Sequence, residues 1–486
     1  MESHDGTVHD VITKLSEHET LQSSQRDRPN YWASSPATLA TTANVHNIIY
    51  GTGQSIFQSS ILPAIAQARA SVELVTCFWA RSPTLDDLNQ TLRALSARAS
   101  LDGRTVRVRI CFSSSSLWQK LLHTMSTTGQ TYAPAKYQTA LGLPSPAELP
   151  GLDLQVKSIF ILPFSVMHPK FVIVDRRQVF LPSCNVSWEN WFEGCMELSG
   201  PIADQFVRFW LDFWASNEDR ASMSKATSND EDRTYAPKLP PSAVGAHGYH
   251  ESPAERLLAS QLVDIQDAQA VFLPSPHHQN PQFVFTWQSH VAPPPTPLNI
   301  CLLALFAAAK STIFIQTPNL TSPPVLAALL SATERGIDVH IRTSESLMVL
   351  EQLVTAGTTT ARCVNHLIEQ HKRLSQARGG TNGDSTDLEA GLVAQVAGHL
   401  RIDYYRAKAA NPSEESVTEP VQSHLKLTIV DDRIMVHGSG NMDRASWYTS
   451  QELGVAFIST KLVNAMKDNL TKAMDGRSET VYDSKG

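Results

Sequence analysis

The sequence predicts an α/β protein made of two tandem domains, each a mixed β-sheet flanked by helices. Three observations lead to this prediction. The chain of 486 residues is long enough for two or more ordinary domains. Its helix-like and strand-like segments follow the same order in each half. A short segment that combines charged and apolar residues also occurs twice, once in each half.

Patterns of apolar residues place the elements of each half. Residues 1–45 are polar with few aliphatic side chains, so we expect a tail outside the core. A stretch rich in Ser, Pro and acidic residues, 216–255, reads as a linker between a first domain (46–215) and a second (256–486), the alternative being an ordered surface excursion. Periodicity predicts helices over 61–70, 85–97, 202–215, 298–310 and 324–335, and strands over 72–76, 105–112, 312–315 and 339–342.

The repeated segment reads His-x-Lys-x-x-x-x-Asp in both copies. It supplies a histidine, a lysine and an aspartate each time: His168, Lys170 and Asp175, then His424, Lys426 and Asp431. A short apolar run after each lysine reads as a buried strand. Because residues two apart on a strand share a face, each histidine lies beside its lysine. A lysine that donates to an oxyanion, next to a histidine that attacks or passes a proton, suits an anion site.

A polar turn and a return strand follow each copy. If each turn is tight and lies just after its aspartate, Asn185 returns opposite His168 and Asn441 opposite His424. Each copy then gathers a histidine, a lysine and an asparagine at one point, with a serine nearby. The serines, Ser183 and Ser439, are further candidates for binding the substrate.

Acidic residues around each copy are expected to orient the site. Glu197 and Glu452 are each followed by Leu, and each is a candidate to hold the other ring nitrogen of its own copy's histidine. Asp175 and Asp431 lie where the strand turns. We expect them to bind turn amides or orient neighbours, with direct participation in the reaction as the less favoured alternative.

The doubled motif resembles that of the phospholipase D superfamily, the HKD phosphodiesterases. The resemblance extends to Pro182-Ser183-Cys184-Asn185 and Gly438-Ser439-Gly440-Asn441, and it covers both halves of the chain. The chain departs from the family pattern at Pro182, where the family usually has Gly. It also has Ser187 where the second copy has Asp443. These departures concern the geometry of the loops.

The resemblance implies two phospholipase D-like domains, related by a pseudo-twofold axis, that bring both motifs into one cleft. One histidine would attack a phosphodiester phosphorus and form a phosphohistidine, and the other would protonate the leaving alcohol. By analogy His168 is the nucleophile and His424 the acid and base, although the sequence does not separate them. The groups expected to bind the non-bridging oxygens are Lys170, Lys426, Asn185 and Asn441. No metal or other cofactor is expected, because two ammonium groups neutralise the charge.

The charge and composition of the chain limit the kinds of molecule that it is expected to bind. The net charge of −7 gives no global basic field for nucleic acid. The six cysteines are scattered without CxxC pairs, which argues against a zinc site or a disulfide framework. No signal peptide or bilayer-spanning run is visible, so we favour an intracellular protein that is soluble or touches membranes from outside. One chain supplies both half-sites, so a monomer is expected.

The expected substrate is a phospholipid or related lipid phosphodiester, which is hydrolysed or used for phosphatidyl transfer as in cardiolipin synthase-like members. The alternative is a nuclease or nucleic-acid end-processing enzyme, which would need a local basic groove. The modest cluster Arg104, Arg107 and Arg109 alternates on a strand, so part of it is ordinary surface charge. A degenerate scaffold is disfavoured because both motifs are intact.

Aromatic residues after each asparagine form either core or a rim around the substrate. Trp188, Trp191 and Phe192 alternate with polar residues, which makes a fully buried run less favoured. Trp447 and Tyr448 are candidates for the other side of such a rim. His437 reads most simply as a surface or loop histidine.

Overall fold

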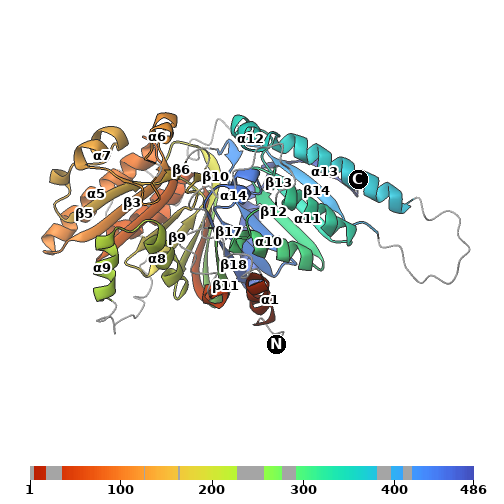
Figure 1. The fold of residues 1–486 in the computed structure, drawn as a ribbon, viewed down its shortest axis with the longest axis horizontal. Coiled ribbons are helices and arrows are strands. Elements are labelled where there is room, and N and C mark those ends of the chain that lie inside the picture. The colour runs from red at the N-terminus through yellow and green to blue at the C-terminus, as the bar shows by residue number, and fades with distance from the viewer. Residues whose placement is uncertain are drawn as a thin grey trace, which may run out of the picture.

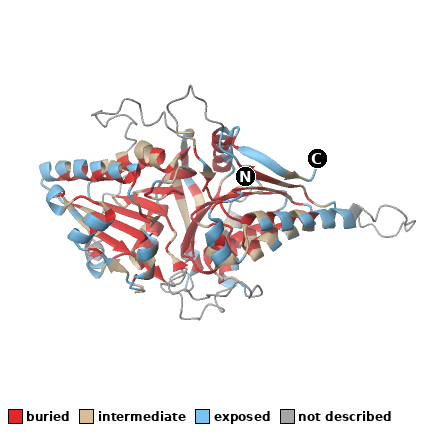
Figure 2. Cartoon of the chain, turned by 90° about the horizontal axis from the view of Figure 1, so that it is seen from above, coloured by how far each residue is buried: buried red, intermediate tan, exposed pale blue. Residues whose placement is uncertain are grey.

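The structure is a computed structural model that describes residues 5–17, 35–124, 126–161, 165–226, 257–275, 292–379, 396–408 and 419–485. Two half-sheets join side by side, each with helices packed against it, in the mixed α/β architecture predicted from the sequence (Figure 1). Buried residues follow the strands through the middle of the molecule, and the exposed residues lie mainly on the helices (Figure 2).

The two half-sheets have matching strand orders. The first runs β1 (Ala40–Gly51), β10 (Trp191–Ser199), β9 (Gln178–Pro182), β8 (Phe171–Val174), β2 (Ser71–Phe78), β3 (Val106–Ser114), β5 (Leu152–Ser158) and β4 (Gln130–Thr131). The second runs β11 (Ala259–Ser275), β18 (Glu452–Ile458), β17 (Ile434–Gly438), β16 (Leu427–Val430), β12 (Thr312–Thr317), β13 (Asp338–Thr343), β14 (Leu400–Tyr405) and β19 (Ser478–Asp483). Antiparallel pairing of β1 with β11 joins the two halves.

Five of the helices lie close to the ranges predicted from the sequence, and the others were not predicted. In the first half the helices include α4 (Leu62–Gln67), α5 (Pro83–Leu101), α6 (Leu117–Leu121), α7 (Pro134–Leu141), α8 (Ile202–Phe213) and α9 (Asn217–Ala226). In the second they include α10 (Pro297–Ala308), α11 (Pro323–Glu334), α12 (Val349–Ala356), α13 (Thr360–Gly379), α14 (Arg444–Tyr448) and α15 (Thr460–Met474). Along the described ranges, none of the helices combines the length and the apolar character that a membrane crossing requires.

The halves share a hydrophobic core. Helix α8 of the first half lies against β11 of the second, and the rings of Phe206 and Phe272 are 5.2 Å apart between centroids. Burial of this apolar surface is the main force that holds the halves together. The relative position of the two motifs is therefore set by a packed core and by the pairing of β1 with β11.

Two predicted boundaries need correction. Helix α1 (Asp5–Glu17) packs against α10 through the buried Val11 and Leu15, and β1 begins at Ala40, so part of 1–45 belongs to the core. The contact was not predicted because α1 has few apolar residues. Two apolar side chains on one face of a helix are nevertheless enough to dock it against the core. In 216–255, α9 is fastened by the buried Asp219, which accepts a hydrogen bond from Arg109 at 2.8 Å. The rest of that stretch, from residue 227, lies outside the described residues.

Candidate active site

The two motif histidines meet at the junction of the halves. The ring centroids of His168 and His424 are 6.5 Å apart, and the rings are nearly perpendicular, at 86°. Their side chains are 13% and 5% exposed, respectively. Two segments remote in sequence thus present two imidazoles to one small, largely buried space.

Pairing between the halves positions His168. The backbone N–H of His168 donates to the carbonyl of Gln451 at 3.0 Å, and the N–H of Gln451 donates to Val166 at 2.9 Å. Gln451 directly precedes β18 of the second half. The chain entering the first motif is therefore hydrogen-bonded to the strand that carries Glu452.

His424 is held in the equivalent way. Strand β15 (Gln422–Ser423) pairs in parallel with the start of β10, and the N–H of His424 donates to Phe192 at 2.9 Å. The chain entering the second motif is thus fixed to the strand that carries Glu193. Each half supplies the backbone edge on which the other half's histidine rests.

Each histidine is oriented by a glutamate of the opposite half. Nδ1 of His168 lies 2.9 Å from Oε2 of Glu452, and Nδ1 of His424 lies 2.8 Å from Oε1 of Glu193. A carboxylate that accepts from Nδ1–H fixes the tautomer in which Nε2 carries the lone pair. The expected pairing of each glutamate with its own copy's histidine is therefore wrong, because the contacts cross between the halves.

Glu197 does not take the role predicted for it. Its Oε1 accepts a hydrogen bond from Gln178 at 2.6 Å, and it lies opposite Phe180 within the β9–β10 ladder. Glu197 lies four positions after Glu193 on β10, which is a distance of roughly 13 Å along a strand. Helix α14 lengthens the corresponding loop of the second half, so a fixed spacing from the histidine selects the wrong glutamate.

The serines bind these glutamates. Ser183 Oγ donates to Glu193 Oε2, and Ser439 Oγ donates to Glu452 Oε2 at 2.5 Å. Both serines are fully buried or nearly so. They lie behind the histidines and hold the carboxylates, which corrects their predicted role in substrate binding.

The asparagines occupy different surroundings in the two halves. The register of β8 and β9, with Val172 opposite Phe180, would bring position 184 rather than Asn185 opposite His168, so the assumed hairpin was one residue out. Oδ1 of Asn185 accepts from Thr76 Oγ1 at 3.2 Å and from the N–H of Phe78 at 3.1 Å. These bonds leave its amide nitrogen as the group that can donate to a ligand.

In the second half the asparagine is bonded to an aspartate. Nδ2 of Asn441 donates to Asp443 Oδ2 at 3.0 Å, and its buried Oδ1 has no partner among the described residues. Ser187 stands at the corresponding place in the first half. Because the first half has Ser187 in place of an aspartate, the amide nitrogen of Asn185 is not bonded as that of Asn441 is. Asn185 is therefore the asparagine that can donate to a ligand.

The motif aspartates fasten the hairpins. Asp175 accepts hydrogen bonds from three consecutive backbone N–H groups, 69–71, and Asp431 accepts from 310–312. Burial tends to raise the pKa of Asp431, but these amides hold it below its ordinary value. The carboxylates bind amides, as favoured from the sequence, although these amides lie at the starts of β2 and β12 and not in the turns. They lie at the ends of β8 and β16 away from the histidines.

The turns themselves explain why Asp suits this position. Asp175 and Arg176 have φ of 51° and 57°, and Asp431 and Asp432 have φ of 53° and 50°. Two successive left-handed residues are typical of a type I′ hairpin turn, which Asp tolerates better than most residues. The geometry fixes each hairpin tightly after its motif strand.

The lysines place two amino groups next to the histidines. Lys170 Nζ donates to the carbonyl of His168 at 2.8 Å, and Lys426 Nζ donates to that of His424 at 2.5 Å. Both are buried, and burial lowers the pKa of Lys426 to about 7. Each lysine keeps N–H groups that can bind an anion once one is used for the carbonyl.

Burial also controls the charge of the histidines. It lowers the pKa of His168 and lowers that of His424 to about 3, against the opposing effect of their glutamates. Burial tends to raise the pKa of Glu193, but His424 and Lys426 bring it below its ordinary value. Without ligand, both imidazoles are therefore neutral near pH 7 and the Glu193 carboxylate is charged.

Aromatic side chains contribute to only one side of the site. The ring of Trp191 lies 4.8 Å from that of His424 between centroids, and Trp188 is 67% exposed. Phe192 is buried, as are Trp447 and Tyr448, which were expected on the opposite rim. Those two belong to the core because α14 turns them inward.

The prediction that His437 is a surface or loop histidine is wrong. His437 is buried on β17, and its nitrogens lie 3.1 Å from the carbonyl of Lys426 and 3.3 Å from that of Leu181.

Two arginines of the predicted cluster form ion pairs. Arg109 is bound by Asp153 and Asp219, and Arg104 pairs with Asp102. These two arginines serve the fold and do not form a groove for nucleic acid.

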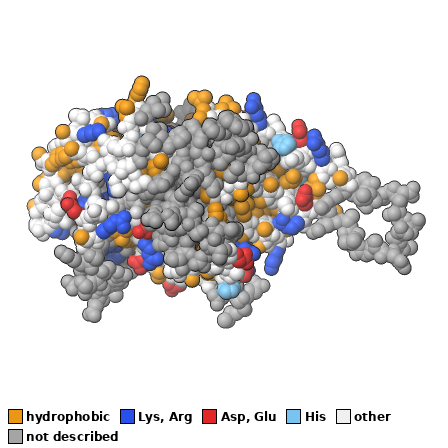
Figure 3. Space-filling model, viewed as in Figure 1, with side chains coloured by type: hydrophobic (Ala, Val, Ile, Leu, Met, Phe, Trp, Pro, Cys, Tyr) orange, Lys and Arg blue, Asp and Glu red, His pale blue; other side chains and the backbone are white. Residues whose placement is uncertain are grey.

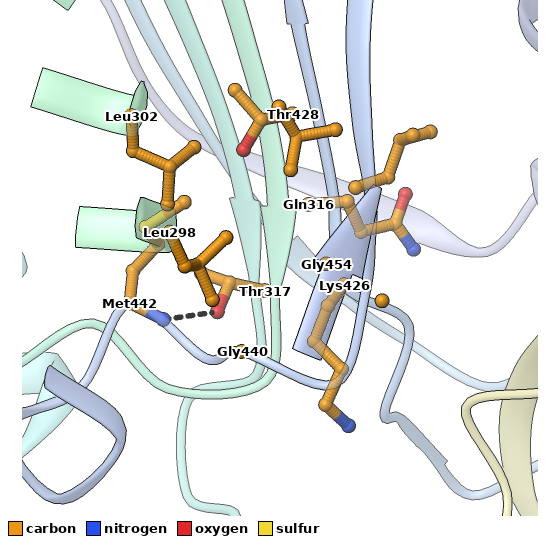
Figure 4. A pocket seen from close by; sticks show the side chains of 12 residues that line it. Leu298, Leu302, Gln316, Thr317, Lys426, Thr428, Gly440, Met442 and Gly454 are labelled. Atoms are coloured by element: carbon orange, nitrogen blue, oxygen red, sulfur yellow. Dashed lines mark hydrogen bonds between the residues drawn. The ribbon is translucent and has the colours of Figure 1, made fainter. Parts of the chain in front are cut away.

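A small pocket lies beside Lys426 (Figure 4). It measures about 20 Å³ and is lined by residues that include Gln316, Thr317 and Gly440. That volume holds about one water molecule. The pocket is therefore no place for a substrate. In the described parts of the chain no group of three or more His, Cys, Asp or Glu residues is arranged to hold a metal ion.

Comparisons with known proteins show one matching family and two solved structures of similar fold. A family described as "Cardiolipin synthase, PLD-like domain" matches residues 302–474. The fold is similar to that of phosphatidylserine synthase from Haemophilus influenzae, with a TM-score of 0.50 and 14% identity over 93% of this chain and 92% of that chain. A second similar structure is Nuc, a phospholipase D family member from Salmonella typhimurium, with a TM-score of 0.23 and 18% identity over 37% of this chain and 89% of that chain. No curated protein matches the chain.

The first of these structures covers both halves, so the likeness in fold extends beyond the part matched by the family. Both copies of the His-x-Lys motif lie at the junction of those halves. Residues 302–474 thus match a family of PLD-like domains, and the fold of both halves is similar to that of a phosphatidylserine synthase.

Proposed function

We propose that this protein is a phosphodiesterase or phosphatidyltransferase that acts on phospholipid-type phosphodiesters through a phosphohistidine. The observation that carries the proposal is the pair of imidazoles 6.5 Å apart, each held at Nδ1 by a carboxylate. With Nδ1–H bound in this way, both Nε2 atoms are available for reaction. Two such atoms in one space suit an in-line displacement, with one on each side of a phosphorus.

In the first step, Nε2 of one histidine forms a bond to phosphorus and the bond from phosphorus to the leaving oxygen breaks. The second histidine gives its proton to that oxygen. It must therefore be protonated when substrate is bound, and an anionic phosphodiester favours this by raising the pKa of the imidazole. In the second step the same histidine takes a proton from water or an alcohol, whose oxygen displaces the histidine nitrogen from phosphorus.

The buried lysines would bind the non-bridging oxygens. Lys170 and Lys426 point from equivalent positions of the two halves, and each is already tied to the carbonyl of its histidine. Donors fixed in a site shielded from water stabilise developing charge without reorganising, and losing one typically costs about 3–4 kcal/mol of barrier. The amide nitrogen of Asn185 would be a further donor in the first half.

We assign His168 as the nucleophile and His424 as the acid and base. His168 is the more exposed of the two, and Trp191 packs against the ring of His424. A nucleophile needs access to phosphorus, whereas an acid needs a fixed position beside the leaving group.

A turnover panel tests the proposal. Phosphatidylcholine, phosphatidylglycerol with an alcohol acceptor, and single-stranded DNA are each incubated with the full chain in the presence of EDTA. Release of choline or glycerol, with EDTA having little effect, is the expected result. Cleavage of DNA with no action on either lipid would overturn the substrate class, and strict dependence on metal would contradict phosphohistidine chemistry. The His168→Asn variant provides the blank.

A further inference from the structure

Helix α12 exposes its apolar side chains to solvent. Leu350 is 76% exposed, Val354 51% and Leu353 40%. The buried residue of this helix is polar, Gln352. A surface helix of a globular protein normally has the reverse arrangement, with its apolar face toward the core.

Hydrogen bonds fix the outward orientation of α12. Gln352 Nε2 donates to the carbonyl of Leu347 at 2.6 Å, and its Oε1 accepts from the backbone N–H of Thr360 at 2.6 Å. A buried amide with both ends bonded cannot leave without losing these partners. The exposure of the apolar face is thus a property of the folded helix.

The first half adds a matching feature on α6 and just after it. Trp118 is 73% exposed and Leu122 is 80% exposed. In Figure 1, α6 and α12 lie at the same edge of the molecule, one in each half. Hydrophobic side chains gather along that edge in Figure 3. We define the apolar rim as Trp118, Leu122, Leu350, Leu353 and Val354.

The part of the apolar rim on α12 lies beside the site. Helix α12 packs against α14, which directly follows the Asn441–Asp443 loop. Asn441 and Asp443 are both largely buried and are joined by a hydrogen bond of 3.0 Å.

We propose that the apolar rim docks into the surface of a lipid bilayer and so presents the site to phosphodiesters at the bilayer interface. The exposure of the apolar rim is independent of the proposed function, whereas the choice of a lipid surface as its partner rests on that function. Trp, Leu and Val side chains grouped on two helices are suited to the boundary between headgroups and acyl chains. Lys120, between Trp118 and Leu122 in sequence, adds one positive charge and Glu351, next to Leu350, adds one negative charge, so the apolar side chains carry the docking.

Sedimentation with vesicles tests this docking. The full chain, in a His168→Asn background so that lipid is not consumed, is spun with vesicles of phosphatidylcholine alone and with phosphatidylglycerol added. We expect binding to both kinds of vesicle, because the apolar side chains carry it. Leu350→Glu and, separately, Trp118→Glu should each weaken binding by about tenfold or more, because burying one such side chain is worth at least that factor.

Leu101→Glu is the matched control. Leu101 is 88% exposed at the end of α5 and is not part of the apolar rim. Replacing it with Glu should therefore leave sedimentation with vesicles unchanged. Equal melting temperatures for all variants exclude unfolding as the cause. Absence of binding by the parent chain, or equal binding by all variants, would overturn the inference. A dimer that Leu350→Glu dissociates in size exclusion would assign the rim to a second copy instead. Sedimentation measures binding and not turnover. The docking proposal can therefore fail while the proposed reaction stands, and the proposed reaction can fail while docking is observed.

Discussion

Nδ1 of His424 lies 2.8 Å from Oε1 of Glu193, although the two residues belong to opposite halves of the chain. The same relation holds between His168 and Glu452, at 2.9 Å. Neither half therefore contains a complete, oriented histidine. The tautomer of each imidazole depends on the correct docking of the other half, which couples assembly of the fold to the formation of the site.

Removing the charge of Glu193 should impair turnover strongly. Glu193→Gln keeps the size of the side chain but no longer stabilises an imidazolium at His424, and the amide can favour the wrong tautomer. We expect kcat to fall by about a hundredfold or more, by comparison with the loss of an orienting carboxylate in other histidine-dependent enzymes. Steady-state kinetics on lipid substrate measures this. Glu197→Gln is the control and should keep activity, because Glu197 bonds to Gln178. Equal losses in both variants would contradict the crossed pairing.

The local features of the site could be predicted from the sequence. The strand period places His168 beside Lys170, and a tight turn after Asp175 returns the chain, because both depend on neighbouring residues alone. The repeat of the pattern around His424 then indicated two half-sites. The helices and strands of each half follow from periodicity for the same reason.

The features that were missed depend on contacts between distant segments. Glu193 meets His424 because β15 pairs with β10, and no local pattern encodes that pairing. Ser183 was expected to face the substrate but binds Glu193 instead. Counting from the serines would not have found Glu193 either, because Glu193 is the tenth residue after Ser183 whereas Glu452 is the thirteenth after Ser439.

Replacing either histidine should stop turnover, and the two variants should differ in what accumulates. His168→Asn removes the assigned nucleophile, so no phosphoenzyme should form. His424→Asn removes the group that activates water, so an intermediate on His168 should persist if the first step still proceeds with an activated leaving group. Acid-sensitive, alkali-stable labelling from a phosphorus-labelled diester measures this. Labelling of His168→Asn but not His424→Asn would reverse the assignment, and activity in either variant would contradict a shared site.

The pH profile should report Lys426. Burial lowers the pKa of Lys426 to about 7, so in the free enzyme it loses its proton as the pH rises through neutrality. A neutral lysine binds a phosphate oxygen less well, and we expect kcat/KM to fall above about pH 7. Lys426→Arg, which stays charged, should lower activity at neutral pH yet shift this limb to higher pH. Lys461→Arg, on an exposed part of α15, is the control. A profile of kcat/KM that is flat well above pH 7 would contradict the assignment.

Removing the charge of Asp431 should reduce stability more than catalysis. Its carboxylate accepts hydrogen bonds from the backbone N–H groups of 310–312, and charged bonds of this kind contribute about 1.5–3 kcal/mol. The pKa of Asp431 is lower in the folded state, so this contribution is present above its unfolded pKa and is lost as the pH falls through the folded pKa. Asp431→Asn should therefore unfold at lower urea concentration at neutral pH, with a smaller difference in acid. Asp468→Asn, exposed on α15, should unfold like the parent chain. Loss of turnover in a fully folded Asp431→Asn variant would instead place the carboxylate in the reaction.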